Sequence, residues 1–113
     1  MFTLYGIPNC DTVKKARKWL ENNAVEYQFH DFRKDGLDTS TVESWISALS
    51  WEQVVNKRST SWRALSDETK ANMDNATAVA EIIKQPTLIK RPVLVGDNTL
   101  QLGFKESDYQ QLT

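Results

Sequence analysis

Hydrophobic and polar residues alternate in two short segments near the start of the chain, residues 2–5 and 25–32. Alternation with a period of two is typical of β-strands. The segment between them predicts a helix that starts directly after Cys10 and ends at Asn22–Asn23, because its apolar residues recur at helical spacing: Val13, Ala16 and Leu20. A crossover from strand through helix to strand is right-handed, so we expect the two strands to be parallel.

Apolar residues at helical spacing also occupy the middle of the chain, in three stretches: 42–49, 51–70 and 76–84. The second stretch is irregular and favours several short helices over one long one. Two β-rich runs, 93–95 and 99–102, then flank a Gly-Asp-Asn turn, which is typical of a hairpin. A short helix is predicted over 106–112.

This order of elements is that of an α/β thioredoxin-like fold with a mixed four-stranded sheet. The helices of the middle region, about residues 37–84, are then an insertion into that fold. A length of 113 residues suits one domain, so we predict a single domain over residues 1–113.

Charge and composition narrow the classes of function. A net charge of −1 gives no electrostatic footprint for nucleic acid or for an anionic membrane. The apolar runs are far shorter than the ~20 residues of a membrane span, and no secretory signal precedes the first strand, so we expect a cytoplasmic monomer. One cysteine and one histidine supply neither an internal disulfide nor a structural zinc site, and no metal is expected.

Cys10 is the first candidate for chemistry, because it follows a strand and opens a helix. Free backbone amides and the positive end of the helix dipole favour a thiolate there. Asn9, Thr12 and Lys14 are candidate anion-binding neighbours. The alternative is a buried structural cysteine. Because position 13 is Val13 and no second cysteine exists, an adduct on Cys10 needs a thiol from outside, with glutathione the obvious candidate.

Two arginines are the next candidates. Arg91 precedes Pro92, which opens a strand, and a guanidinium held beside a thiolate is suited to bidentate binding of an oxyanion. Arg58 is the second arginine that we consider. The alternative is that Arg58 and Arg91 are surface arginines without a role.

Three segments, in order, resemble the arsenate reductase (ArsC) family of thioredoxin-fold proteins, and the resemblance spans almost the whole chain. They are residues 5–12 (YGIPNCDT), 56–58 (NKR) and 85–93 (QPTLIKRPV). The resemblance implies that Cys10 is the nucleophile and that Arg58 and Arg91 bind the oxyanion. It also implies a cis peptide bond before Pro92.

The chain departs from the family's arsenate reductases after the last strand. Those enzymes have a third arginine where this chain has Phe104, and the adjacent Lys105 is a flexible point charge instead of a planar fork. The opening and closing segments look closer to the YffB-like and Spx-like branch. YffB-like proteins are regarded as glutathione-dependent thiol reductases, whereas Spx-like regulators bind RNA polymerase and switch through a Cys-x-x-Cys pair that Val13 removes here.

The resemblance therefore implies a monothiol reductase that uses glutathione as co-substrate. In this hypothesis Cys10 attacks a disulfide or a small oxyanion, and glutathione or glutaredoxin resolves the adduct. Three alternatives stay open: an arsenate reductase proper, a non-catalytic Spx-like regulator that binds RNA polymerase, and a domain whose cysteine is vestigial.

Overall fold

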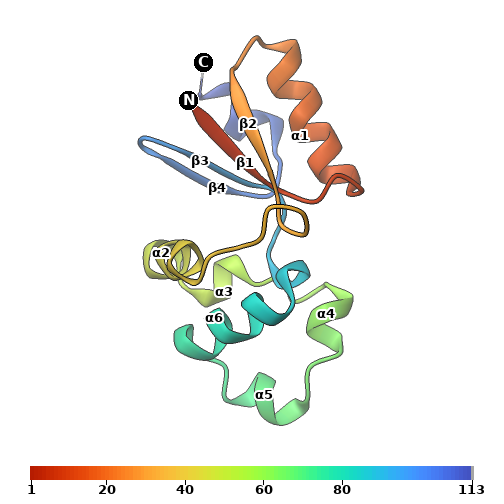
Figure 1. Cartoon of the computed structure of the whole chain (residues 1–113), viewed down its shortest axis with the longest axis vertical. Coiled ribbons are helices and arrows are strands. Elements are labelled where there is room, and N and C mark those ends of the chain that lie inside the picture. The colour runs from red at the N-terminus through yellow and green to blue at the C-terminus, as the bar shows by residue number, and fades with distance from the viewer. Residues whose placement is uncertain (113) are drawn as a thin grey trace. The chain divides into compact units, whose positions relative to one another are not determined.

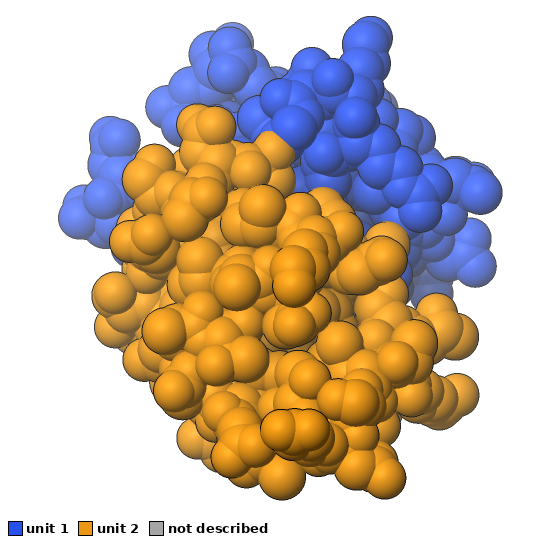
Figure 2. All heavy atoms as spheres, turned by 60° about the horizontal axis from the view of Figure 1, so that its bottom comes forward, with its two compact units in different colours: residues 1–36, 91–113 blue, residues 37–90 orange. Residues whose placement is uncertain are grey.

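The computed structural model describes residues 1–112 and divides into two compact units, which Figure 2 colours separately. The sheet unit combines Met1–Gly36 with the segment that starts at Arg91, and the helical unit is Leu37–Lys90. The helices expected as an insertion thus lie in the helical unit. That the whole chain forms one domain stays a prediction.

The sheet unit is built on four strands in the order β2-β1-β3-β4 (Figure 1). Strands β1 and β2 are parallel, whereas β3 is antiparallel to both β1 and β4. This mixed sheet, with α1 as the crossover, confirms the thioredoxin-like α/β fold. The elements of the unit are β1 (Phe2–Gly6), α1 (Asp11–Asn22), β2 (Tyr27–Asp31), β3 (Val93–Gly96), β4 (Thr99–Leu102) and α7 (Glu106–Gln110).

The register brings four chain segments to one end of this sheet. Gly6 pairs with Asp31 where β1 and β2 both end, and Tyr5 pairs with Val93 where β3 begins. Val93 in turn pairs with Leu102 at the end of β4. The chain therefore leaves β1, β2 and β4, and enters β3, at the same end of the sheet.

Helices α1 and α7 pack on one face of the sheet. The face of α1 that turns inward is apolar, and its residues share a buried cluster with Leu4 of β1, Leu94 of β3 and Tyr109 of α7. Tyr109 meets Trp19 edge-on, with ring centroids 5.5 Å apart at 87°. Burial of this α1 stripe explains why its helical spacing was visible in the sequence.

The helical unit contains short helices around a core of its own, in which α2 packs against α6. Its elements are α2 (Thr39–Leu49), α3 (Trp51–Val54), α4 (Thr60–Arg63), α5 (Asp67–Ala71), α6 (Asn75–Lys84) and the 3₁₀ turn η1 (Pro86–Leu88). Its buried apolar residues include Val42, Trp45, Ile46, Val54, Ala78, Ile82 and Leu88. The expectation of several short helices between residues 51 and 70 is confirmed.

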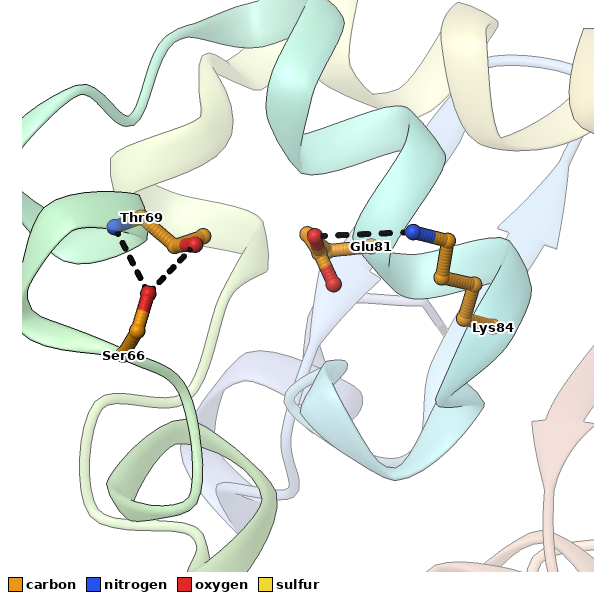
Figure 3. Close-up of polar contacts among 4 residues, drawn as sticks. All are labelled: Ser66, Thr69, Glu81 and Lys84. Atoms are coloured by element: carbon orange, nitrogen blue, oxygen red, sulfur yellow. Dashed lines mark hydrogen bonds and ion pairs between the residues drawn. The ribbon is translucent and has the colours of Figure 1, made fainter.

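Side-chain caps start three of these helices. A serine or aspartate oxygen accepts the backbone N–H three residues further on, which satisfies one of the free donors at a helix start. The pairs are Ser59 with Trp62, Ser66 with Thr69, and Asp74 with Thr77. Figure 3 shows the Ser66 cap and, on α6, the ion pair between Glu81 and Lys84 at 3.9 Å.

Several element boundaries differ from the sequence prediction; α7, for example, ends at Gln110 and not at residue 112. Strand β2 begins at Tyr27, not at residue 25, because the chain first closes α1: Ala24 has a φ of 55°, and Val25 donates its N–H to the Leu20 carbonyl at 2.9 Å. Helix α2 begins at Thr39, one polar turn before the apolar stripe. No helix within residues 1–112 is long and apolar enough to cross a bilayer.

Candidate functional site

Cys10 is the N-cap residue of α1, with φ −132° and ψ 124°. It is half-buried, its thiol is free of any disulfide, and its carbonyl accepts the N–H of Lys14 at 2.9 Å. Its side chain makes no capping hydrogen bond. The thiol is thus held at the start of a twelve-residue helix, where the amides and the dipole favour a negative charge.

The close approach of α1 to β1 depends on Gly6. A β-carbon at this position would lie 2.8 Å from Cγ2 of Val13, closer than side chains tolerate. Val13 is fully buried. The position at which a Cys-x-x-Cys protein carries its second thiol is therefore a packing position in this chain.

Arg91 and Pro92 lie directly before β3. The Arg91–Pro92 peptide bond is cis, as the family resemblance implied. Pro92 is buried and its carbonyl accepts the N–H of Gly103 at 2.9 Å, while Arg91 is half-buried. By the strand register, the segment that carries Arg91 leaves the sheet at the same end as the loop that leads to Cys10.

Phe104, which stands where the third arginine of the arsenate reductases would fall, turns its ring inward. It meets Tyr109 edge-on at 4.8 Å between ring centroids. Lys105 is the N-cap residue of α7 and is exposed. After β4 the chain therefore has the flexible ammonium of Lys105, and the apolar ring of Phe104 stands in place of a guanidinium.

The other candidates near Cys10 differ in exposure. Asn9 and Lys14 are exposed and Thr12 is half-buried. Within residues 1–112, none of these three side chains makes a hydrogen bond, and their role in anion binding stays a prediction. No group of three or more His, Cys, Asp or Glu side chains in this part of the chain could hold a metal ion.

Arg58 belongs to the helical unit, where it is exposed in a tight turn. The backbone N–H of Arg58 donates to Oδ1 of Asn56 at 3.0 Å, and the backbone N–H of Ser59 donates to the Asn56 carbonyl at 3.1 Å. The turn presents Arg58 to a pocket of about 670 Å³, whose other lining residues are Glu52, Val55, Asn56, Lys57 and Lys90. Our sequence reasoning missed both lysines, although each lies next to an arginine that it singled out.

Comparison with known proteins decides the family. The model of the ArsC family matches residues 5–112. The chain belongs to the ArsC family. The resemblance seen in the sequence is therefore confirmed.

The curated relatives of this ArsC-family chain include an uncharacterised protein of Haemophilus influenzae. It is 46% identical over 110 residues, which is 97% of this chain and 96% of the relative. The global transcriptional regulator Spx of Streptococcus pyogenes is more distant, at 27% identity over 96% of this chain and 81% of the regulator.

Solved structures agree with this placement. A protein called YffB is 40% identical, with a TM-score of 0.94 over 98% of this chain and 97% of its own. An arsenate reductase-related protein from Brucella melitensis is 44% identical, with a TM-score of 0.80 over 97% and 92% of the two chains. An arsenate reductase from Vibrio cholerae, at 15% identity and a TM-score of 0.84, shows the fold alone.

Proposed function

We propose that this chain is a glutathione-dependent monothiol reductase with Cys10 as its nucleophile. The observation that carries the proposal is the position of Cys10: a half-buried thiol at the N-cap of α1, with buried Val13 three residues on. A single reactive thiol forms an adduct that it cannot resolve alone. A soluble thiol of the glutathione type supplies the second sulfur.

The chemistry is thiol–disulfide exchange in two steps. In the first, the Cys10 thiolate attacks the glutathione sulfur of a mixed disulfide, so that a new S–S bond joins Cys10 to glutathione and the other sulfur leaves as a thiolate that takes up a proton. In the second, the thiolate of another glutathione molecule attacks the glutathione sulfur bound to Cys10. Glutathione disulfide leaves, Cys10 returns as a thiolate, and the substrate has gained two electrons.

Arg91 is proposed to bind a carboxylate or an oxyanion of the substrate, because its segment leaves the sheet at the same end as the loop to Cys10. Arg58 is proposed as a further anion-binding residue, and Asn9, Thr12 and Lys14 as supporting ones. A disulfide is favoured over arsenate as the substrate because Phe104 packs its ring on Tyr109 and leaves no third guanidinium.

A coupled assay tests this proposal. The protein is mixed with reduced glutathione, the mixed disulfide of glutathione and 2-mercaptoethanol, glutathione reductase and NADPH, and NADPH oxidation is followed. We expect turnover that is lost in Cys10→Ser and reduced in Arg91→Gln. Turnover that persists in Cys10→Ser contradicts the proposal.

Two further measurements address the alternatives. Arsenate replaces the disulfide in a parallel assay, and faster turnover of arsenate overturns our preference for a thiol substrate. Capture of RNA polymerase subunits by the full chain, together with no turnover of either substrate, favours the Spx-like alternative.

A further inference from the structure

The pocket of about 670 Å³ in the helical unit is strongly cationic. Three of its six lining residues carry positive charge, Lys57, Arg58 and Lys90, against one carboxylate from Glu52. The chain as a whole has a net charge of −1. Positive charge is therefore concentrated at this cavity and does not follow from the overall composition.

A short antiparallel pairing joins the segment that ends at Lys90 to the segment that leads into Lys57 and Arg58. Val55 and Ile89 form an isolated β-bridge, and Lys90 donates its N–H to the Val54 carbonyl at 2.9 Å. Asn56 donates its N–H to the Leu88 carbonyl at 2.7 Å. Lys90 therefore lies across from Val54, three residues before Lys57.

Lys57 is oriented by two tryptophans. Trp51 and Trp62 stack with ring centroids 6.2 Å apart at 15°. The Lys57 ammonium lies 5.0 Å from the centroid of Trp51 and 5.9 Å from that of Trp62. A cation over the face of tryptophan is attracted to the ring, so the two tryptophans restrain the Lys57 side chain, which loses less freedom on binding an anion.

None of the three cations is neutralised by the protein. Within residues 1–112, no carboxylate lies within 4.0 Å of the charged group of Lys57, Arg58 or Lys90. Three unpaired positive groups around one cavity repel each other, and a bound anion relieves that repulsion. A guanidinium adds a fork that matches a carboxylate or a phosphate.

We propose that this pocket binds a small organic molecule that carries at least two negative charges, with Lys57, Arg58 and Lys90 as its ligands. Its volume lies within the about 300–1,000 Å³ of ordinary small-molecule sites. Three cationic side chains and the single carboxylate of Glu52 line the pocket, which favours a ligand with more than one negative charge. The proposal deepens the anion-binding role proposed above for Arg58, but it concerns binding alone and is tested without the thiol chemistry of Cys10.

Isothermal titration calorimetry of the full chain tests this proposal, with Cys10→Ser as background to exclude thiol exchange. Citrate and S-methylglutathione represent carboxylates, pyrophosphate represents phosphates, and acetate represents a single charge. We expect a Kd below about 1 mM for at least one multivalent probe and at least about tenfold weaker binding of acetate. The probe that binds identifies the ligand class.

Matched variants separate the site from general charge effects. Lys57→Gln with Lys90→Gln should weaken binding at least about tenfold, whereas Lys18→Gln with Lys34→Gln removes the same charge from exposed positions in the sheet unit and should change it less than about twofold. Trp51→Phe should weaken it about two- to fivefold, because phenylalanine attracts a cation less than tryptophan does.

Three results would overturn the proposal. They are no heat of binding from any multivalent probe at about 10 mM, acetate binding as tightly as the multivalent probes, and equal effects of the two double variants. Far-UV circular dichroism and thermal unfolding of each variant show whether the helical unit remains folded. Because no arm measures reductase activity, the result stands apart from that of the coupled assay.

Discussion

Gly6 of β1 and Val13 of α1 are in such close contact that a β-carbon on Gly6 would lie 2.8 Å from Cγ2 of Val13. Val13 is in the first turn of α1, and Cys10 caps the same turn. The contact therefore holds the start of the helix against the strand and fixes the place of the thiol. It also means that Gly6 is required by space and not by its backbone angles.

A double-mutant cycle tests this contact. Gly6→Ala should lower the free energy of unfolding by about 1–3 kcal/mol, because the new methyl group overlaps Val13. Val13→Ala alone should cost about 2 kcal/mol by leaving a cavity. The double variant should cost less than the sum by at least about 0.5 kcal/mol, because alanine at position 13 makes room for the methyl. Additive costs in denaturant unfolding contradict the contact.

Val13→Cys tests the account of Val13 as the residue that leaves Cys10 without a partner thiol. Position 13 is three residues from Cys10 at the start of α1, and thiols in this arrangement form a disulfide in Cys-x-x-Cys proteins. Mild oxidation of this variant should remove both free thiols and leave a monomer, whereas wild-type protein should keep its thiol or form a mixed adduct. Thiol titration and mass spectrometry measure this. Two thiols that both persist contradict the expected geometry.

Tyr109 gives a prediction for high pH. It is fully buried, and its hydroxyl has no hydrogen-bond partner among residues 1–112. Burial raises the pKa of Tyr109 above its ordinary value of 10. The unfolded chain ionises this group near pH 10 and the folded chain does so only at higher pH, so its contribution to stability is complete below pH 10 and is lost as the pH rises through the folded pKa.

Tyr109→Phe should keep the edge-on contacts with Trp19 and Phe104 while it removes the buried hydroxyl. At pH 7 we expect the free energy of unfolding to be unchanged or about 1 kcal/mol higher. Between pH 10 and 11 the variant should lose less stability than wild type. Denaturant unfolding at these pH values measures both effects, and a large loss at pH 7 would reveal a hydrogen bond that this account lacks.

Asp74 gives the matching prediction for low pH. Its carboxylate accepts the backbone N–H of Thr77 at 2.7 Å, and this hydrogen bond holds the pKa of Asp74 below its ordinary value of 3.8. Its contribution to stability is therefore present above pH 3.8 and lost as the pH falls through the lowered folded pKa. Asp74→Ala should lower the melting temperature at pH 6 and reduce its fall towards pH 3.

Asp74→Asn is the control, because it keeps an oxygen that can cap α6 but does not titrate. It should retain most of the stability at pH 6 and show the reduced acid dependence of Asp74→Ala. Equal acid dependence in all three proteins would contradict a role of this cap.

Much of the fold could be predicted from the sequence, because the apolar residues that an element buries recur with the period of the helix or strand. Val13, Ala16 and Leu20 face the core of the sheet unit, so their spacing predicted α1 correctly. A polar first turn, such as that of α2, contains no apolar residues at helical spacing. The predicted start of α2 was therefore too late. The late start of β2 depends on the backbone of Ala24, which has a positive φ although it is not a glycine.

The candidate site was predictable in part. Cys10 could be placed at a helix start from the strand and helix signals around it. The pocket beside Arg58 could not be predicted, because it depends on the pairing of Val55 with Ile89, residues that are 34 positions apart. The stacking of Trp51 on Trp62, which orients Lys57, is likewise a tertiary contact that no local pattern records.

The most direct test of the central claim is the rate at which iodoacetamide alkylates Cys10 at pH 6. The control is an unstructured peptide with the sequence of residues 5–13, which carries the same neighbours without the helix. Because only the folded protein places this sulfur at the amide end of a helix, we predict that the protein reacts at least about tenfold faster than the peptide, and that Arg91→Gln narrows this difference. Equal rates for protein and peptide would contradict the account of Cys10 as an activated nucleophile.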